Sequence, residues 1–244
     1  MKTLIIIPSR LSATRLPGKP LLKINGISII SHVFKKAVEA NIGEVFIAAE
    51  DQEIIEDVKK NGGQAILTSS NHKTGTDRIH EALIKLERSD IELIINLQGD
   101  EPLMNIEDIR KLHNQMIITK SELGTLASNI LDKKSYEDQN LVKVVTKESL
   151  ESSQFPEALN FMRKINCGIK NTYHHLGIYC YQVEILKKFV SLDQSQNEIK
   201  NKLEQLRALD NNMQINVSLA KDSSVGVDTQ EDFMAIKKIM EYKS

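Results

Sequence analysis

Cysteine is scarce in this sequence, and the residues present form no disulfide or metal-binding pattern. Among 244 residues there are two cysteines, Cys167 and Cys180, and they make no CxxC pair. The histidines do not cluster at the spacing of metal ligands. These absences argue against a disulfide scaffold and against a zinc site, and they favour a reducing, cytoplasmic setting.

The sequence also lacks an excess of charge and any long apolar run. Its formal net charge of −1 gives no indication of non-specific binding to nucleic acid or to an acidic membrane. The apolar run from Leu4 to Ile7 is too short for a signal peptide or a membrane span, and no other segment qualifies. Repeats, low-complexity tracts and long linkers are missing too. We therefore expect one large α/β domain or two small ones, with no nucleic-acid partner and no membrane insertion.

Up to about residue 120, apolar runs typical of strands alternate with patterns typical of helices. Strands are expected at residues 4–7, 44–49, 64–68 and 91–97, and helices at 28–40, 51–60, 76–86 and 106–118. Gly62 and Gly63 follow the second helix as a C-cap should. This β-then-α order predicts an α/β fold with a doubly wound, mostly parallel sheet.

After residue 120 the expected strands lie closer together. They are predicted at residues 123–130, 141–146, 159–162 and 174–181, followed by helices at 184–190 and 199–209. A strand at 214–219 and an amphipathic helix at 229–242 close the chain. We expect residues 1–120 and 211–244 to form an α/β core, and residues from about 121 to 210 to form a smaller mixed subdomain inserted into it.

A basic loop follows the first strand. Residues 8–20 read PSRLSATRLPGKP, and they place Arg10, Arg15 and Lys19 at the carboxyl edge of the sheet, where open α/β sheets bind ligands. Gly18 allows close approach of the backbone to a ligand, and Arg and Lys with backbone N–H groups can cradle phosphate oxygens. The spacing is neither that of a Walker A loop nor that of the dinucleotide fingerprint. The alternative is a solvated loop with scattered charges.

Two acidic segments follow later strands. Asp100, in the segment QGDEP at 98–102, comes directly after a buried strand, and a carboxylate there beside phosphates suits Mg²⁺. Asp228 precedes Thr229, which with Asp232 fits an S/T-x-x-D capping motif and leaves Asp228 available as a second metal ligand. The alternatives are a turn or cap role for Asp100 and a purely capping role for the second segment.

A polar loop at residues 68–78, TSSNHKTGTDR, joins a strand to a helix. Its hydroxyls and backbone amides suit a base or a ribose. The alternative is an ordinary helix-entry loop, because Thr-Gly-Thr-Asp is rich in capping residue types.

These segments occur together, in the same order, in one enzyme family. The basic loop, QGDEP at 98–102, HLGIY at 175–179, LEQLR at 203–207 and GVDT at 226–229 make the chain resemble the 3-deoxy-manno-octulosonate (Kdo) cytidylyltransferases from residue 3 to about 240. The resemblance implies a nucleotide-sugar transferase fold, a cytoplasmic homodimer formed by the smaller subdomain, and transfer of CMP from CTP to Kdo with Mg²⁺. Diphosphate is released, and the product serves lipopolysaccharide biosynthesis.

The resemblance also implies residue roles. Arg10, Arg15 and Lys19 correspond to contacts of the CTP triphosphate, with Arg15, Lys19 and Asp100 as catalytic residues. Asp100 and Asp228 correspond to the Mg²⁺ ligands, and Thr76, Asp77 and Arg78 to the cytosine and ribose side. The sugar-acid side corresponds to Gln98, Arg163, His175, Tyr179, Glu204 and Gln205, with Arg163 as the partner of the Kdo carboxylate.

The sequence departs from the family pattern in three places, and the first two bear on the sugar pocket. Met162 stands where serine is usual before Arg163, the Ile-Pro usual after that arginine is missing, and Ala49-Glu50 replaces Thr-Asp. A sister enzyme acting on 8-amino-Kdo or a sialic acid would keep the nucleotide motifs and change the sugar pocket. A non-catalytic nucleotide-binding module would not need both Asp100 and Asp228. No side chain is marked by the sequence as an obligatory general base.

Overall fold

The computed structural model describes residues 1–12, 15–166, 168–223 and 226–242. Cys167 lies outside the described residues. The chain forms two compact units: an N-terminal unit of residues 2–106 with the C-terminal segment, and a middle unit of residues 107–223. The sequence placed the corresponding boundaries near residues 120 and 210, so a helix and a strand assigned to the core fall in the middle unit instead.

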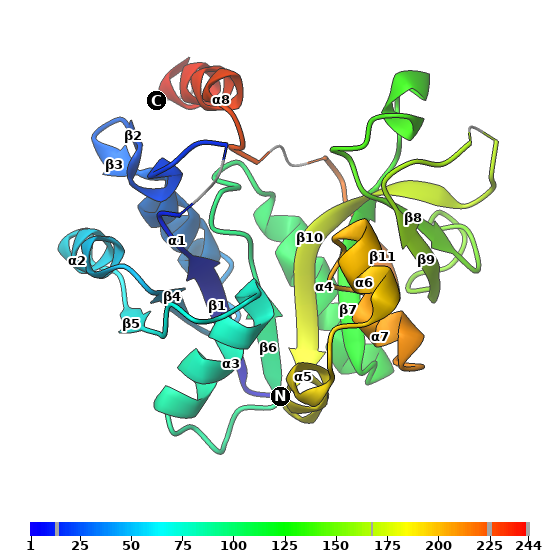
Figure 1. Ribbon diagram of the computed structural model, residues 1–244, viewed down its shortest axis with the longest axis horizontal. Helices are drawn as coiled ribbons and strands as arrows, with labels where there is room; N and C mark the ends of the chain where they lie inside the picture. Colours follow the sequence, from blue (N-terminus) through cyan, green and yellow to red (C-terminus); the bar gives the residue numbers. More distant parts are fainter. Residues whose placement is uncertain (13–14, 167, 224–225, 243–244) are drawn as a thin grey trace. The chain divides into compact units, whose positions relative to one another are not determined.

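The N-terminal unit is built on four parallel strands in the order β6-β1-β4-β5 (Figure 1). Strand β1 lies between β6 and β4, with Ile5 opposite Ile95 on one side and Val45 on the other. Its residues Leu4 to Ile7 are completely buried, as the apolar run predicted. The strands are β1 (Thr3–Ser9), β4 (Glu44–Ala49), β5 (Ala65–Leu67) and β6 (Leu93–Asn96).

Helices connect these strands where the hydrophobic periodicity predicted them. They are α1 (Ile29–Glu39), α2 (Gln52–Lys60) and α3 (Gly75–Lys85). Helix α2 ends at Lys60. Beyond its cap, Gly62 has a φ of 81° and donates to the Lys59 carbonyl, while Gly63 donates to the Val58 carbonyl. This pair of bonds is the Schellman arrangement expected from the two glycines.

A short hairpin in the N-terminal unit was not predicted. Strands β2 (Lys23–Ile24) and β3 (Ile27–Ser28) follow the 3-10 turn η1 (Lys19–Leu21). They are joined by Asn25 and Gly26, whose φ values of 50° and 78° are those of a type I′ turn. The strands are too short to give an alternating pattern in the sequence.

The C-terminal segment packs against this hairpin (Figure 1). Helix α8 (Gln230–Tyr242) contributes Phe233 and Ile236 to an apolar cluster with Ile24 and Ile29. Val227 belongs to the same cluster, and its N–H donates to the Asp100 carbonyl at 2.9 Å. The segment at 226–229 is thereby fixed beside the loop that follows β6.

The middle unit has a mixed sheet in the order β11-β7-β10-β8-β9. Within the described part of this unit, β11 and β7 pair in parallel, and β7 with β10, β10 with β8 and β8 with β9 pair antiparallel. The strands are β7 (Leu123–Ser128), β8 (Lys143–Thr146), β9 (Ala158–Met162), β10 (Thr172–Gln182) and β11 (Asn216–Leu219). Helices α4 (Ile106–Thr119), α5 (Val183–Ser191), α6 (Gln196–Asn201) and α7 (Leu206–Asp210), with the 3-10 turn η2 (Lys133–Tyr136), complete the unit.

The prediction of one helix at residues 199–209 was wrong. Two helices, α6 and α7, occupy this region, and the chain breaks at Lys202, whose φ is 53°. Most of the remaining elements lie within a few residues of their predicted places. No helix among the described residues is long and apolar enough to cross a membrane.

Candidate functional site

The basic loop and the Asp100 loop leave neighbouring parallel strands at the same end. Strand β1 ends at Ser9 and β6 ends at Asn96, and the two strands are paired. The residues that follow them therefore meet at the carboxyl edge of the sheet, as predicted. Gly99 is required here, because a Cβ at this position would lie 2.9 Å from the Pro8 carbonyl oxygen.

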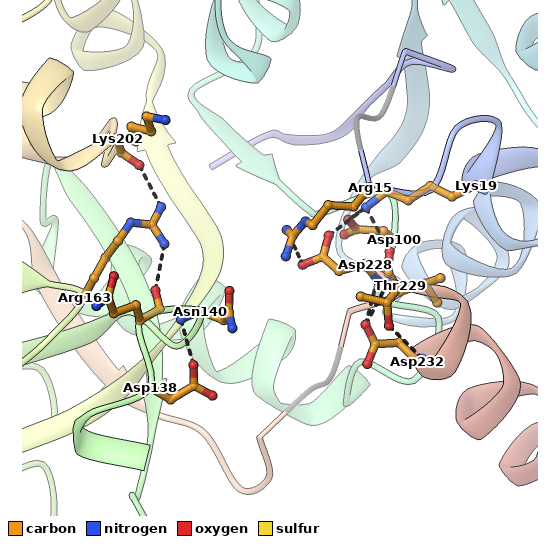
Figure 2. A network of polar contacts seen from close by, with 12 residues as sticks. Arg15, Lys19, Asp100, Asp138, Asn140, Arg163, Lys202, Asp228, Thr229 and Asp232 are labelled. Carbon is orange, nitrogen blue, oxygen red and sulfur yellow. Dashed lines mark hydrogen bonds and ion pairs between the residues drawn. The ribbon is translucent and has the colours of Figure 1, made fainter. Parts of the chain in front are cut away.

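Lys19 is the centre of the polar network at this edge (Figure 2). Its ammonium donates to Asp100 Oδ2 at 2.5 Å and to Asp228 Oδ1 at 3.1 Å. It also donates to the Val227 carbonyl oxygen at 2.9 Å. Arg15 Nη2 lies 2.8 Å from the other oxygen of Asp228. The structure thus brings together four of the residues singled out in the sequence, from three separate segments.

The charge state of Lys19 follows from these contacts. Burial acts to lower the pKa of the ammonium, but the charges and hydrogen bonds of Asp100 and Asp228 outweigh it, and the pKa is raised from 10.5. Lys19 therefore stays protonated throughout the physiological range.

The segment that carries Asp228 is also a helix cap, as predicted. Thr229 Oγ1 accepts a hydrogen bond from the Asp232 N–H at 3.2 Å, and Asp232 Oδ2 accepts from the Thr229 N–H at 2.9 Å (Figure 2). Asp232 Oδ2 accepts from the Asp228 N–H as well, at 3.2 Å. The side chain of Asp228 takes no part in this cap, so its carboxylate is available to Lys19, Arg15 or a metal ion.

The residues around Lys19 fit a magnesium ion. Two carboxylates and one backbone carbonyl already converge on a single cation, and all three supply hard oxygen ligands. Mg²⁺ is commonly held by one or two carboxylates together with substrate phosphates rather than by an all-protein cage. Accordingly, no group of three or more His, Cys, Asp or Glu side chains forms a metal site within the described ranges.

A cavity of about 280 Å³ lies beside this network in the N-terminal unit. Arg10, Lys19 and Arg78 give its wall positive charge, and Gln98 and Asp100 add polar oxygen atoms. The rest of the wall comes from residues 8–9, 20, 72–75 and 99. A pocket with several cations and a few polar groups suits a small anionic ligand.

The loop at residues 72–75 lines this cavity, and two of the three residues predicted for the cytosine and ribose side do not. Thr76 is buried, and Asp77 forms a capping box with Thr74, with both hydrogen bonds at 3.2 Å. The loop singled out in the sequence lines the cavity, and its role toward a base or ribose stays a prediction. However, helix α3 begins at Gly75, so the side chains that face the cavity come earlier than expected, from His72 onward.

Arg78 lines the cavity but is held firmly by protein groups. Its side chain is 3% exposed and forms an ion pair with Glu50, whose side chain is 12% exposed. It also donates to Thr68 Oγ1 at 2.6 Å. Glu50 accepts from the Ser12 hydroxyl at 3.4 Å, and Asp51 accepts from the Leu11 N–H at 2.7 Å. The departure at Ala49-Glu50 therefore supplies a residue that anchors both Arg78 and the basic loop.

In the middle unit, the Arg163 guanidinium bonds backbone carbonyls. Its Nε and Nη2 donate to the carbonyls of Asn201 and Lys202 at 3.0 Å, and its Nη1 donates to that of Gln139 at 3.1 Å (Figure 2). The described contacts use three of its five N–H donors. Arg163 thus joins the end of β9 to the break between α6 and α7, while one N–H on each terminal nitrogen is not used by these contacts.

Lys143 supports the same region and was missed by the sequence reasoning. The residue is 1% exposed, and its ammonium donates to the carbonyls of Leu141 and Arg163 at 2.7 Å and to that of Asp138. Burial lowers the pKa of this ammonium. Nothing in the sequence distinguishes this lysine from a strand-edge residue.

His175 and Tyr179 lie together on β10, within the strand predicted at residues 174–181. Their ring centroids are 5.5 Å apart, and Phe161 packs edge-on against His175 at 5.0 Å. Burial lowers the pKa of His175 to about 3, so the ring is neutral. Burial, together with Tyr181 and Glu204, raises the pKa of Tyr179. Gln205 is buried at the start of α7, next in sequence to Glu204.

A buried ion pair joins the two short helices of the middle unit. Arg207 makes a bidentate contact with Glu198, at 2.8 and 2.7 Å, and both side chains are less than 5% exposed. The guanidinium also lies 4.6 Å from the centroid of the Phe189 ring. Arg207 belongs to the LEQLR segment, but no role was predicted for it.

Comparisons with known proteins agree on one family. The family model described as cytidylyltransferase matches residues 4–215. Two proteins named 3-deoxy-manno-octulosonate cytidylyltransferase are similar over 98% of the chain. The one from Afipia carboxidovorans is 41% identical over 96% of its own length, and the one from Thermodesulfovibrio yellowstonii is 42% identical over 98%.

Solved structures give the same result. The structure of CMP:2-keto-3-deoxy-manno-octonic acid synthetase complexed with CTP matches with a TM-score of 0.89 and 32% identity, over 100% of both chains. A 4-diphosphocytidyl-2C-methyl-D-erythritol synthase structure from Anaerococcus prevotii shares the fold, with a TM-score of 0.64 and 15% identity. The predicted α/β class with a mostly parallel sheet is confirmed.

Proposed function

Because the chain belongs to the 3-deoxy-manno-octulosonate cytidylyltransferase family, we propose that it transfers CMP from CTP to Kdo and releases diphosphate. The product, CMP-Kdo, is the activated sugar acid used in lipopolysaccharide biosynthesis. The observation that carries the proposal is the cluster of Lys19, Asp100 and Asp228. Similarity over nearly the full length to enzymes of this name supports the proposal. A module that only bound nucleotide would not need both carboxylates.

The reaction forms one bond to phosphorus and breaks another. The anomeric hydroxyl oxygen of Kdo attacks the α-phosphorus of CTP in line and loses its proton, and the bond from this phosphorus to the bridging oxygen of the diphosphate breaks. Positioning and charge neutralisation supply most of the acceleration in such transfers. The protein residues therefore need to bind and orient the two substrates and to neutralise the phosphate charge.

We assign the cations of the basic loop to the triphosphate. Lys19, held protonated, and Arg15 neutralise charge that accumulates on the leaving diphosphate. Arg10 lines the cavity, and we assign it to the same triphosphate. Arg78 and the loop at residues 72–75 form the side of the cavity for the nucleoside, and Thr76 and Asp77 support it through packing and capping.

Asp100 and Asp228 would hold Mg²⁺. The ion, when bound, supplies neutralisation of phosphate charge near the reacting atoms. In the middle unit we assign Arg163 to the Kdo carboxylate and His175, Tyr179, Glu204 and Gln205 to the sugar. Gln98 of the N-terminal unit lines the cavity and is assigned to the sugar-acid side. We also propose that the protein forms a homodimer through its middle unit and that it is cytoplasmic.

The test is turnover with CTP, Mg²⁺ and a panel of sugar acids comprising Kdo, 8-amino-Kdo and a sialic acid. Diphosphate release and the mass of the CMP-sugar are measured together. We expect CMP-Kdo, with kcat/KM for Kdo at least about tenfold above that for the other acids. A preference for another acid would reassign the substrate, and formation of no CMP-sugar at all would reject the activity.

A further inference from the structure

Thr125 on β7 contacts both the His175 ring and the irregular part of β10. Thr125 is completely buried. The hydroxyl oxygen lies 2.9 Å from His175 Nε2, 2.7 Å from the Ile178 carbonyl oxygen and 3.3 Å from that of Leu176. The pairing of β10 with β7 shifts register between Leu176 and Tyr179, so both carbonyls lie at this irregularity.

These distances assign the protons. Two oxygen atoms 2.7 Å apart need a proton between them, and a carbonyl has none to give. The single hydroxyl proton of Thr125 therefore goes to the Ile178 carbonyl. Toward His175 the hydroxyl can then only accept, so Nε2 must carry a proton.

The second nitrogen of His175 is then fixed as well. Burial lowers the pKa of the ring to about 3, so at neutral pH it carries one proton. With this proton on Nε2, Nδ1 has a lone pair and acts as an acceptor. Phe161 and Tyr179 pack on the ring and restrict its plane.

We propose that Thr125 is a positioning residue that holds His175 in the Nε2–H tautomer, so that Nδ1 accepts a hydrogen bond from a hydroxyl of the sugar acid. This inference rests on the proposed function for the part that concerns the sugar. The tautomer itself is a property of the protein alone. The two parts can therefore be tested separately.

The first test is nuclear magnetic resonance of the full-length protein with ¹⁵N-labelled histidine. Long-range proton–nitrogen correlations distinguish protonated from unprotonated ring nitrogens, and the His175 signals are those missing from the His175→Phe variant. We expect Nε2 protonated and Nδ1 unprotonated at neutral pH. A protonated Nδ1, or a doubly protonated ring, would overturn the proposal whether or not the enzyme uses Kdo.

The second test compares Thr125→Val, which keeps the β-branched shape without the hydroxyl, with Thr125→Ser, which keeps the hydroxyl. In the valine variant we expect mixed tautomers and a KM for Kdo raised roughly five- to thirtyfold, the effect of one lost buried hydrogen bond. In the serine variant we expect a single tautomer and a KM near the original, with the KM for CTP unchanged in both.

An unchanged tautomer and an unchanged KM for Kdo in Thr125→Val would contradict the proposal. If the valine variant fails to fold, the wild-type spectrum and the serine variant still decide the tautomer. If Kdo is not a substrate, the spectra decide the tautomer and the turnover panel rejects the function, so the two failures are distinguishable.

Discussion

The Lys19 ammonium contacts two carboxylates that are also the proposed ligands of a metal ion arriving with the substrate. It lies between Asp100 and Asp228, and Arg15 contacts Asp228 from its other oxygen. Opposite charges so close hold one another in position without a ligand. Binding of a triphosphate offers Lys19 and Arg15 new anionic partners, which leaves the two carboxylates available for Mg²⁺.

Asp100→Asn should nearly abolish transfer while the fold remains intact. The substitution removes a negative charge from the proposed metal site but keeps the size of a side chain that is 26% exposed. We expect a loss of kcat of at least about a hundredfold, measured at saturating CTP across a Mg²⁺ titration. Near-normal turnover at high Mg²⁺ would show that Asp100 is not a ligand.

Asp90→Asn is the matched control for this charge removal. Asp90 precedes β6, whereas Asp100 follows it, and Asp90 pairs with Lys2 and Arg88 at the surface. The control should keep its kcat, and circular dichroism and thermal melting should show that both variants are folded.

Lys19→Ala should weaken productive binding of CTP. A charge-assisted hydrogen bond to phosphate contributes roughly 1.5–3 kcal/mol, so the KM for CTP should rise about 10- to 150-fold. The KM for Kdo should change little, and steady-state kinetics with each substrate varied in turn measures both. If only the KM for Kdo moved, Lys19 would belong to the sugar side.

At the scale of elements, local sequence predicted most helices and strands because their apolar periodicity and caps agree with the final packing. It failed at residues 199–209, where the pattern continues but the chain breaks at Lys202. That break exposes the carbonyls of Asn201 and Lys202, and Arg163 bonds both. A contact between residues about 40 positions apart cannot be inferred from the periodicity of one segment.

In the candidate site, too, residues with a local sequence signal could be predicted, and residues that act through distant contacts could not. Arg15, Lys19 and Asp100 could be found because they follow β1 and β6, paired parallel strands whose carboxyl ends meet. Asp228 could be found because it stands directly before a recognisable capping motif. The loop at residues 68–78 was singled out as well, but the roles were given to Thr76, Asp77 and Arg78, and helix α3 already begins at Gly75. Thr125 and Lys143 carry no local signal, since a threonine or a lysine in a strand is ordinary.

Breaking the Glu198–Arg207 pair should destabilise the middle unit. Arg207→Met leaves the Glu198 carboxylate buried without its partner, a change that typically costs about 3–5 kcal/mol. The double variant Glu198→Gln/Arg207→Met leaves no unpaired charge and should lose less stability than Arg207→Met alone. Urea unfolding at neutral pH measures each variant, and equal losses in the single and double variants would contradict this account.

The pair should also give the protein a defined acid sensitivity. Burial acts to raise the pKa of Glu198, but Arg207, Gln194 and the Ser195 N–H outweigh it and lower the pKa below the ordinary 4.5. A carboxyl with a lowered pKa in the folded state stabilises the fold above its unfolded pKa and loses this contribution as pH falls through the folded value. The stability difference between wild type and the double variant should therefore shrink below about pH 4.5.

At the scale of the whole molecule, the chain leaves the N-terminal unit at α4 and returns to it with the segment at 226–229 and α8. The return brings Asp228 to Lys19, so the phosphate side of the site depends on residues more than 200 positions apart. Except for Gln98, the residues assigned to the sugar acid belong to the middle unit. Apart from Gln98, substitutions should therefore separate by unit, with those in the N-terminal unit affecting CTP and those in the middle unit affecting Kdo.

Arg163→Lys tests this separation where the sequence departs from the family pattern. The guanidinium already spans the carbonyls of Gln139, Asn201 and Lys202, and its planar fork can still offer one N–H from each terminal nitrogen to a carboxylate. A lysine ammonium has three donors at one point and cannot serve both purposes. We expect kcat/KM for Kdo to fall about 10- to 150-fold, from a loss of roughly 1.5–3 kcal/mol, with the KM for CTP within about twofold of wild type.

The exposed neighbour Lys164, changed to alanine, is the control and should leave both constants unchanged. Thermal melting distinguishes the two roles of Arg163. Loss of the carbonyl contacts lowers the melting temperature measured without Kdo. Loss of the carboxylate contact reduces the rise in melting temperature that added Kdo produces. If Arg163→Lys melts earlier but keeps its full response to Kdo and its kcat/KM, Arg163 holds the fold of the middle unit and another residue binds the carboxylate.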